Sequence, residues 1–182
     1  METRRTRLVF SGSGGQGVIT AAIILAKAAV IYEGKNATQA QSYGAAARGG
    51  ATRSDVLISD LDILYPKVMQ PNILISLTQE SYNKFAPILR PGGLLLMDSR
   101  FVTMEKKVEA RHVDLPMFDT VMKAIGKPIV FNICMLGTLI GLSGLIKPES
   151  ILNVLETTIP KDFMDMNKKA LELGMQMGES AG

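Results

Sequence analysis

Short hydrophobic runs alternate along the chain with longer segments of helical periodicity. Runs of this kind, bounded by glycine, proline and polar residues, are typical of buried strands. The pattern predicts strands over residues 7–10, 37–41, 51–59, 72–77, 94–98 and 108–113. It predicts helices over residues 17–32, 79–86, 117–126 and 129–145, a helix that starts at Pro148, and a last helix that starts close to Lys161.

Most of the predicted strands are continuously apolar, as residues 94–98 are. Such strands occur where helices cover both faces of a mainly parallel sheet. Residues 51–59 differ: Arg53 and Asp55 share one face, and the alternation predicts a strand that is half exposed at first and more buried later. We therefore expect an α/β fold, with a three-layer, mostly parallel, Rossmann-like sheet and helices on both faces. Residues 1–182 show no repeat and no dividing linker, which predicts a single domain.

Two helical segments carry apolar surfaces that need cover. Residues 17–32 are apolar nearly all round, and Lys27 is their only charge. The last helix carries an apolar seam at alternating spacings of three and four, namely Phe163, Met166, Ala170, Leu173 and Met177. Either surface could be covered inside the fold or by another chain. Together they predict that the isolated chain self-associates as a homo-oligomer.

The segment 128–146 carries no charge and has about the length that spans a bilayer. It is only moderately hydrophobic, because it contains asparagine, threonine, serine and three glycines, and no aromatic belt flanks it. We therefore expect a buried helix whose Gly137-x-x-x-Gly141 pair admits a neighbouring element. A membrane partner is not expected.

Residues 12–17, with the sequence GSGGQG, follow the first predicted strand and open the first predicted helix. This is the context that the G-x-G-x-x-G fingerprint requires. Gly12 permits the tight turn, Gly14 lets a ligand approach the backbone, and Gly17 lets helix and strand pack closely. The amides at the helix start then point at one spot, where the helix dipole favours an anion. The alternative, that the glycines serve close packing and bind nothing, stays open.

Dinucleotide enzymes with this fingerprint carry an acidic residue about 20 positions further on, which holds a ribose hydroxyl. Here the second predicted strand runs into Ser42-Tyr43-Gly44 without Asp or Glu, and Glu33 comes too early. A stand-alone nucleotide-binding oxidoreductase is therefore an alternative for which the sequence lacks the ribose-binding acidic residue. A purely architectural subunit, in which the glycine turn docks a neighbouring chain, is another.

Composition narrows the range of partners and cofactors. The formal net charge is +3, and no run of Lys or Arg exceeds a pair, so nucleic acid is not an expected partner. A single cysteine excludes an internal disulfide and a four-thiolate zinc or iron–sulfur site made by this chain alone. No signal peptide precedes the first strand, so a cytoplasmic location is expected.

Few residues are suited to catalysis. His112 lies in a predicted strand, where Asp114 shares its face and braces it, and no further ligand follows at metal spacing. Cys134 lies in the uncharged helix and is expected to be a small buried hydrophobe. No paired carboxylates and no nucleophile elbow are present. We expect no catalytic residue and no metal ligand in this chain.

A binding site is better supported, because ligands of open parallel sheets collect beyond the carboxyl ends of the strands. Arg48 precedes two glycines, which leaves room for its guanidinium to reach a phosphate, a carboxylate or a partner subunit; a surface arginine that caps the loop is the alternative. Thr78 and Asp98 follow two further strands, and Asp98 is expected to be a helix cap or loop brace. The candidate binding residues are Gly12, Gly14, Gly15, Gln16, Gly17, Ser42, Tyr43 and Arg48.

Three segments, taken together, resemble the gamma subunit of 2-oxoacid:ferredoxin oxidoreductases. They are residues 12–18, residues 41–44 with Arg48-Gly49-Gly50, and Asn132 with Leu136-Gly137. The resemblance extends over nearly the whole chain in order and length, and the joint pattern is far more specific than the glycine fingerprint. Gln39 and the Tyr65-Pro66-Lys67-Val68 segment are most like the 2-oxoglutarate branch.

The resemblance implies a non-autonomous subunit of a complex that oxidatively decarboxylates a 2-oxoacid, with 2-oxoglutarate as the first choice. Such a complex joins the acyl group to coenzyme A and passes electrons to ferredoxin. Thiamine diphosphate and 4Fe-4S clusters would be held by the alpha, beta and ferredoxin-like subunits, and none of them by this chain alone. The glycine turn and Arg48 would receive the phosphates of coenzyme A.

Overall fold

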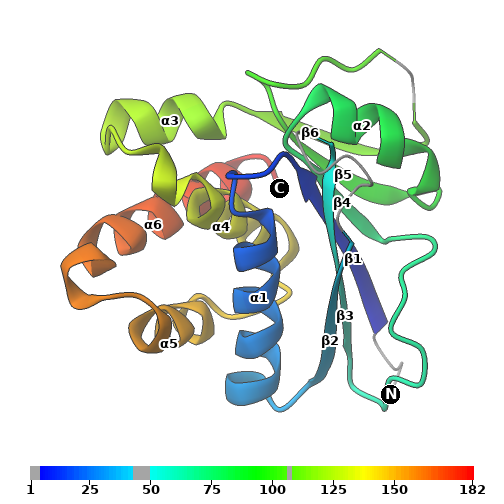
Figure 1. Ribbon diagram of the computed structural model, residues 1–182, viewed down its shortest axis with the longest axis horizontal. Helices are drawn as coiled ribbons and strands as arrows, with labels where there is room; N and C mark the ends of the chain where they lie inside the picture. The colour runs from blue at the N-terminus through cyan, green and yellow to red at the C-terminus, as the bar shows by residue number, and fades with distance from the viewer. Residues whose placement is uncertain (1–4, 43–49, 106–107) are drawn as a thin grey trace.

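The computed structural model describes residues 5–42, 50–105 and 108–182. Its centre is a six-stranded sheet in the order β2-β3-β1-β4-β5-β6 (Figure 1). The strands are β1 (Arg5–Gly12), β2 (Asn36–Ser42), β3 (Thr52–Ser59), β4 (Ile73–Ser76), β5 (Gly93–Asp98) and β6 (Ala110–Leu115). The α-helices are α1 (Val18–Glu33), α2 (Gln79–Phe85), α3 (Met117–Ala124), α4 (Phe131–Ser143), α5 (Pro148–Thr158) and α6 (Met164–Ser180), and the 3-10 turns are η1 (Ala86–Ile88), η2 (Pro128–Val130) and η3 (Lys161–Phe163).

One strand runs against the others. The pairs β1–β4, β4–β5 and β5–β6 are parallel, whereas β3 is antiparallel to both of its neighbours, β1 and β2. The predicted mostly parallel sheet is therefore a mixed sheet. Because β3 is reversed, its first residues lie at the same end of the sheet as the carboxyl ends of the other strands. The register shows this, since Thr52 pairs with Gly12 and Arg53 pairs with Ser42.

Helices cover both faces of the sheet, which confirms the predicted three layers (Figure 1). One face carries α1, α3, α4, α5 and α6 over a large core that includes Phe10 of β1 and Leu25 of α1. The other face carries α2 and η1, which pack on β1 and β4 around Val9, Leu74 and Tyr82. The two helical layers are thus very unequal in thickness.

The first half of β3 is more buried than its sequence predicts. Thr52 and Ser54 are buried, and Asp55 is about 9% exposed. The prediction of a half-exposed start was wrong, because polar side chains at these positions find partners inside the molecule: Ser54 accepts a hydrogen bond from Gln39 at 2.7 Å, and Asp55 pairs with Arg53. The polar residues of β3 therefore belong to internal hydrogen bonds and an ion pair, and they do not mark an exposed surface.

Helices α4 and α6 pack backbone against backbone. A Cβ atom on Gly137 would overlap the carbonyl of Leu171, and one on Gly174 would overlap the carbonyl of Cys134. A Cβ on Gly141 would lie 2.6 Å from the carbonyl oxygen of Met175. The predicted Gly137-x-x-x-Gly141 pair does admit a neighbouring element, and that element carries a matching Gly174-x-x-x-Gly178 pair.

The last helix presents a different face to the core from the one predicted. The predicted seam lies mostly at the rim: Phe163 is 47% exposed, Met166, Leu173 and Met177 are half-buried, and Ala170 alone of the five is buried. The buried line runs instead through Asn167, Leu171, Gly174 and Gly178. The close approach of α6 to α4 decides which face of α6 is buried. That face contains Gly174 and Gly178, which a pattern of large apolar residues does not reveal. The fold thus covers the predicted seam only in part.

Over the described ranges, no helix has the length and apolar character that a membrane crossing requires. The uncharged segment that prompted this question forms η2 and the 13-residue helix α4, which packs against α6, α1 and α3. The expected buried helix is confirmed, although it is shorter than residues 129–145 because a 3-10 turn precedes it and the left-handed Gly144 ends it.

Candidate functional site

The glycine turn of residues 12–17 lies where β1 ends, beside the residue that follows β4. Gln16 closes the turn from within, since its Oε1 accepts the N–H of Ser13 at 2.8 Å and its Nε2 donates to the carbonyl of Leu77 at 3.1 Å. A Cβ on Gly12 would lie 2.5 Å from Oε1 of Gln16. Glycine at position 12 therefore makes room for the Gln16 side chain, and Gln16 acts as an internal brace.

Gly14 and Gly15 form the tip of the turn and face open space. No described atom lies within 4 Å of the position that a Cβ would take on either residue. Gly15 has a φ of 88°, in the left-handed region that favours glycine, whereas Gly14 does not. The tip is thus the part of the turn that has room for a ligand or for another chain.

Gly17 packs against a helix that is distant in the sequence. Its φ is 73°, and a Cβ there would lie 2.6 Å from Nδ2 of Asn132, in the first turn of α4. That Nδ2 donates to the carbonyl of Gly17 at 3.3 Å. The Oδ1 of Asn132 is buried and accepts no hydrogen bond from a described residue. Gly17 therefore packs closely against α4, and the three atoms nearest to its Cβ position all belong to Asn132.

The electrostatics at the start of α1 favour an anion. The helix has Gly17 as its N-cap, no side-chain cap and no acidic residue in its first turn, so its first amides lack intrahelical acceptors. The helix dipole adds partial positive charge at this end. Helix α4, which reaches the turn through Asn132, also begins without a side-chain cap or an acidic residue. The start of α4 thus contacts Gly17, where α1 begins.

Thr78 and Asp98, at the carboxyl ends of β4 and β5, have structural roles. Thr78 caps α2 through a capping box with Ser81, whose N–H donates to the Thr78 hydroxyl at 3.2 Å. The buried Asp98 accepts the N–H groups of Arg100 at 3.0 Å and of Phe118 at 2.8 Å, which ties β5 to the start of α3. Burial raises the pKa of Asp98, and its two hydrogen bonds offset the effect in part. The expected cap or brace at Asp98 is confirmed.

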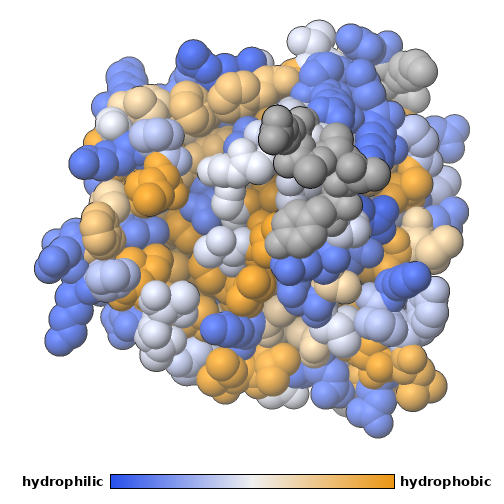
Figure 2. Space-filling view, viewed as in Figure 1, coloured by the Kyte–Doolittle hydropathy of each residue, from blue (hydrophilic) through white to orange (hydrophobic). Residues whose placement is uncertain are grey.

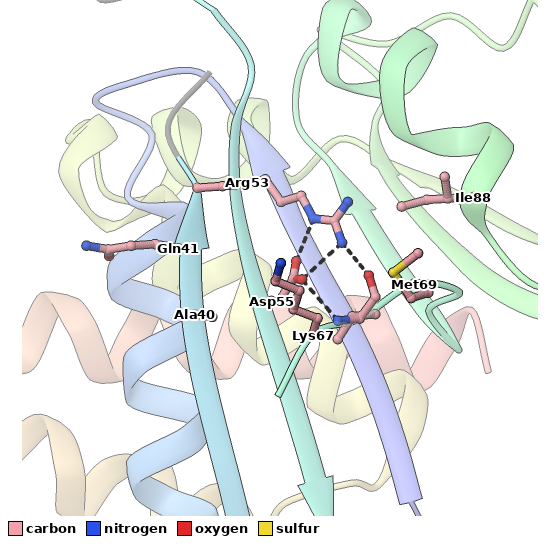
Figure 3. A pocket seen from close by; sticks show the side chains of 9 residues that line it. Ala40, Gln41, Arg53, Asp55, Lys67, Met69 and Ile88 are labelled. Atoms are coloured by element: carbon pink, nitrogen blue, oxygen red, sulfur yellow. Dashed lines mark hydrogen bonds and ion pairs between the residues drawn. The ribbon is translucent and has the colours of Figure 1, made fainter. Parts of the chain in front are cut away.

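Ser42 lies one strand away from the turn, because it pairs with Arg53 of β3, which pairs in turn with Ser11 of β1. It lines a hollow of about 390 Å³ between β2, β3 and the segment that follows β3 (Figure 3). Tyr43 and Arg48 lie outside the described residues. The turn residues are therefore brought together, Ser42 is set apart from them by β3, and the roles of Tyr43 and Arg48 stay predictions.

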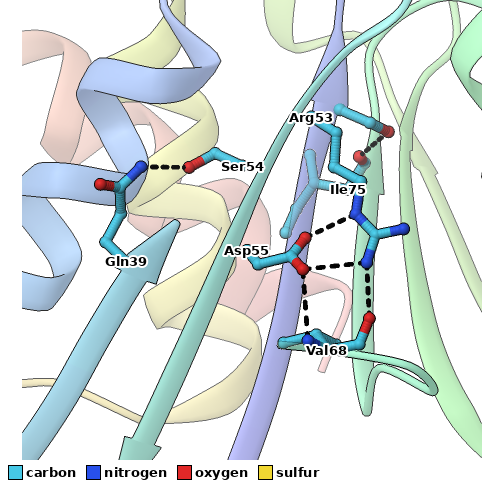
Figure 4. A network of polar contacts seen from close by, with 7 residues as sticks. Gln39, Arg53, Ser54, Asp55, Val68 and Ile75 are labelled. Carbon is cyan, nitrogen blue, oxygen red and sulfur yellow. Dashed lines mark hydrogen bonds and ion pairs between the residues drawn. The ribbon is translucent and has the colours of Figure 1, made fainter. Parts of the chain in front are cut away.

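Arg53 and Asp55 form an ion pair in this hollow that the sequence analysis did not single out as a site. Arg53 donates to the two carboxylate oxygens of Asp55 at 2.5 and 3.0 Å and to the carbonyl of Val68 at 2.6 Å (Figures 3 and 4). The N–H of Val68 donates back to Asp55 at 3.2 Å. Opposite charges two residues apart on a strand share one face, and that spacing was the available signal.

His112 and Cys134, the other residues considered as candidates for chemistry, lie in the framework of the fold. His112 lies in the edge strand β6, and its Nε2 is buried without a hydrogen-bond partner among the described residues. Burial raises the pKa of Cys134 to about 12, as expected of a small buried hydrophobe. Within the described part of the chain, no group of three or more His, Cys, Asp or Glu could hold a metal ion.

Fold and site together define a three-layer α/β protein with a glycine turn whose tip faces open space. The family described as pyruvate ferredoxin/flavodoxin oxidoreductase matches residues 7–177, and the chain belongs to it. The chain is 38% identical over 177 residues to the 2-oxoglutarate synthase subunit KorC of Methanocaldococcus jannaschii, which covers 96% of this chain and 95% of the relative.

Solved structures agree. The gamma subunit of a keto/oxoacid ferredoxin oxidoreductase from Geobacter sulfurreducens PCA superposes with a TM-score of 0.89 at 38% identity, over 98% of both chains. The 2-oxoglutarate:ferredoxin oxidoreductase from Magnetococcus marinus, with 2-oxoglutarate, coenzyme A and succinyl-CoA bound, shares the fold at a TM-score of 0.87 and 18% identity, over 97% of this chain and 31% of that one. The predicted gamma-type, non-autonomous oxidoreductase subunit is confirmed.

Proposed function

We propose that this chain is the gamma subunit of a 2-oxoglutarate:ferredoxin oxidoreductase, assembled with alpha, beta and ferredoxin-like subunits in the cytoplasm. Such a complex releases the carboxylate of 2-oxoglutarate as carbon dioxide, joins the succinyl group to the thiol of coenzyme A and passes the electrons to ferredoxin. The observation that carries the proposal is the near-full-length similarity to four 2-oxoglutarate synthase subunits, at 34 to 38% identity.

In this proposal the redox cofactors belong to the partner subunits. An iron–sulfur cluster of the 4Fe-4S type needs four thiolates, and this chain has one cysteine. Cys134 is buried in α4, and burial holds the pKa of its thiol at about 12, far from thiolate chemistry at neutral pH. The clusters are therefore assigned to the partner subunits, and the family resemblance implies that thiamine diphosphate is likewise held by the alpha, beta and ferredoxin-like subunits.

The proposed role of the chain in catalysis is to receive coenzyme A. The open tip at Gly14 and Gly15 leaves room for a phosphate, and the uncapped amides of α1 supply hydrogen-bond donors and partial positive charge. Gly12, Gln16 and Gly17 hold the turn in shape. Tyr43 and Arg48 would approach the ligand from the connection between β2 and β3, and Ser42, which β3 separates from the turn, would contact a more distant part of the coenzyme.

Kinetics of the reconstituted complex test this role. We expect Gly14→Val to raise the KM for coenzyme A about tenfold and to leave the KM for 2-oxoglutarate unchanged, since the added side chain occupies the phosphate position and a charged hydrogen bond is lost. Arg48→Ala should act in the same direction. The control is Lys161→Ala in η3, far along the chain on an exposed surface. Ferredoxin reduction is the readout.

Three results would contradict parts of the proposal. An unchanged KM for coenzyme A in both variants, together with loss of assembly in Gly14→Val, would favour the architectural alternative, in which the turn docks a neighbouring chain. A complex that reduces ferredoxin with pyruvate or 2-oxoisovalerate in preference to 2-oxoglutarate would place the chain in another branch of the family. Binding of NAD by the isolated chain would favour the stand-alone oxidoreductase.

A further inference from the structure

The face of the sheet that carries α2 is only partly closed by helices. Helix α2 packs over β1 and β4, whereas this side of β3 is covered by residues 60–71, which connect β3 to β4 and are called the strap below (Figure 1). The strap contains no helix or strand. It therefore takes the place of a helical layer on this part of the sheet.

The strap is held in a defined position. Val68 is buried in the smaller core, and both of its backbone polar groups bond to the Arg53–Asp55 pair (Figure 4). At the end of the strap, the N–H of Arg90 donates to the carbonyl of Pro71 at 3.2 Å. A surface that is fixed before binding loses less conformational entropy when a partner arrives.

Two hollows flank the strap, and both are lined by Lys67 and Met69. The first, of about 390 Å³, includes Arg53 and Ile88 (Figure 3). The second, of about 610 Å³, is lined by Arg7, Tyr65, Lys67, Met69 and Arg90 among others. We call the two hollows together the strap groove. Their lining extends from the end of β2 to the turn before β5.

The larger hollow of the strap groove is lined by cationic side chains and by no acidic residue. The side chains of Arg7, Lys67 and Arg90 form no ion pair with a described residue. In the smaller hollow Asp55 balances Arg53. Two carboxylates, Asp60 and Asp62, stand at the start of the strap and line neither hollow, so the positive charge is concentrated at the larger hollow.

Large apolar side chains lie next to these cations. Along the strap Leu61, Leu64, Tyr65 and Met69 are 54, 93, 60 and 70% exposed. In Figure 2, apolar residues reach the surface beside hydrophilic ones on the lower right, the side where the strap runs in Figure 1. Tyrosine, methionine and arginine are enriched in protein interfaces, and a small anion would leave this apolar surface uncovered.

We infer that the strap and the strap groove form a docking surface for an acidic segment of a partner subunit, one that places carboxylates beside apolar side chains. The inference rests on the proposed function, because it assumes that the chain works inside a complex. Charge complementarity selects the carboxylates, and the exposed strap residues select a protein over a small ion. The Arg53–Asp55 pair acts as a positioning element that keeps the strap in place.

Binding of the purified chain to its reconstituted partner subunits tests the inference. We expect the double charge reversal Lys67→Glu/Arg90→Glu to weaken association about tenfold at 0.1 M salt and to flatten its salt dependence, because the rim charges no longer attract the partner. Leu64→Ser/Tyr65→Ser should weaken association with no change in salt dependence. Lys161→Glu in η3 is the matched charge reversal away from the groove and should bind as the wild type does.

Three other results would overturn the inference. If wild type and Lys67→Glu/Arg90→Glu bind the partner subunits equally, the docking surface lies elsewhere while the proposed function stands. If the wild-type chain fails to assemble at all, the proposed function fails as well. If sedimentation of the isolated chain shows a dimer that the double reversal abolishes, while binding to the partner subunits is unaffected, the groove serves a second copy.

Discussion

The glycine turn and the α4–α6 contact use the same residue type, glycine, for opposite purposes. At the contact, glycine is required because the backbone of the facing helix occupies the space of a Cβ, as at Gly137 and Gly174. At the tip of the turn, Gly14 and Gly15 leave space that no described atom fills. A glycine in a packed seam serves stability, and a glycine that faces empty volume leaves room for something outside the chain.

The turn itself contains both kinds of glycine. Gly12 and Gly17 behave like the seam, since a Cβ on them would meet Gln16 and Asn132 respectively. Close packing therefore holds at Gly12 and Gly17, whereas ligand approach stays a proposal for Gly14 and Gly15, where the space is open. This difference makes the two regions separable by experiment.

The largest effect is expected in the seam. Gly174→Ala places a methyl group on the carbonyl of Cys134 and should lower the free energy of unfolding by roughly 3 kcal/mol, the upper end of the range for overpacking, because both neighbours are backbone and cannot repack. Urea unfolding followed by circular dichroism measures it. Gln176→Ala, exposed on the same helix, should stay within about 0.5 kcal/mol of wild type. Equal stability of the two variants would contradict the close contact.

A smaller effect is expected where the turn meets α4. Gly17→Ala combines a left-handed backbone with a contact to Asn132 and should cost about 2 kcal/mol. Asn132→Ala in the same chain should recover about 1 kcal/mol of that cost, because it removes the contacts with Nδ2 and Cγ and leaves the contact with Cβ and the backbone strain. The matched control is Gly14→Ala, with an expected change within about 0.5 kcal/mol. A loss at Gly14 as large as that at Gly17 would abolish the distinction drawn within the turn.

The smallest effect concerns pH, at the opposite end of the same edge. Burial raises the pKa of Asp98 in the folded chain above its ordinary value of 3.8, so the folded state binds this proton more tightly than the unfolded state. Its contribution to stability is full below pH 3.8 and is lost as the pH rises through the raised pKa. Lowering the pH from 7 should therefore shift the stability difference between wild type and Asp98→Asn towards wild type. Unfolding at a series of pH values measures this shift, and a constant difference would contradict it.

Most of the fold could be predicted from the sequence. Continuous apolar runs such as residues 94–98 indicate buried strands, and apolar residues at helical spacing indicate helices. The reversed direction of β3 could not be predicted, since hydrophobic pattern does not encode strand direction. Nor could the orientation of α6, because the contact that decides it is made by glycines, which hydropathy overlooks.

The candidate site was predictable in part for a similar reason. The fingerprint located the turn, because glycine spacing reports backbone geometry directly. The inward use of Gln16 and the contact of Asn132 with Gly17 depend on side chains that meet only after folding, from positions that are 61 and 115 residues apart. The Arg53–Asp55 clamp likewise needs Val68, which comes from a segment without regular structure.

The backward course of β3 has a consequence for how such a chain can diversify. Ser42 and Thr52 stand at one margin of the sheet, on either side of the connection between β2 and β3. The pairs that set the register lie within β1, β2 and β3, so a connection of another length can join Ser42 to Thr52 and leave the strand ladder unchanged. Length changes at this place therefore cost the sheet little.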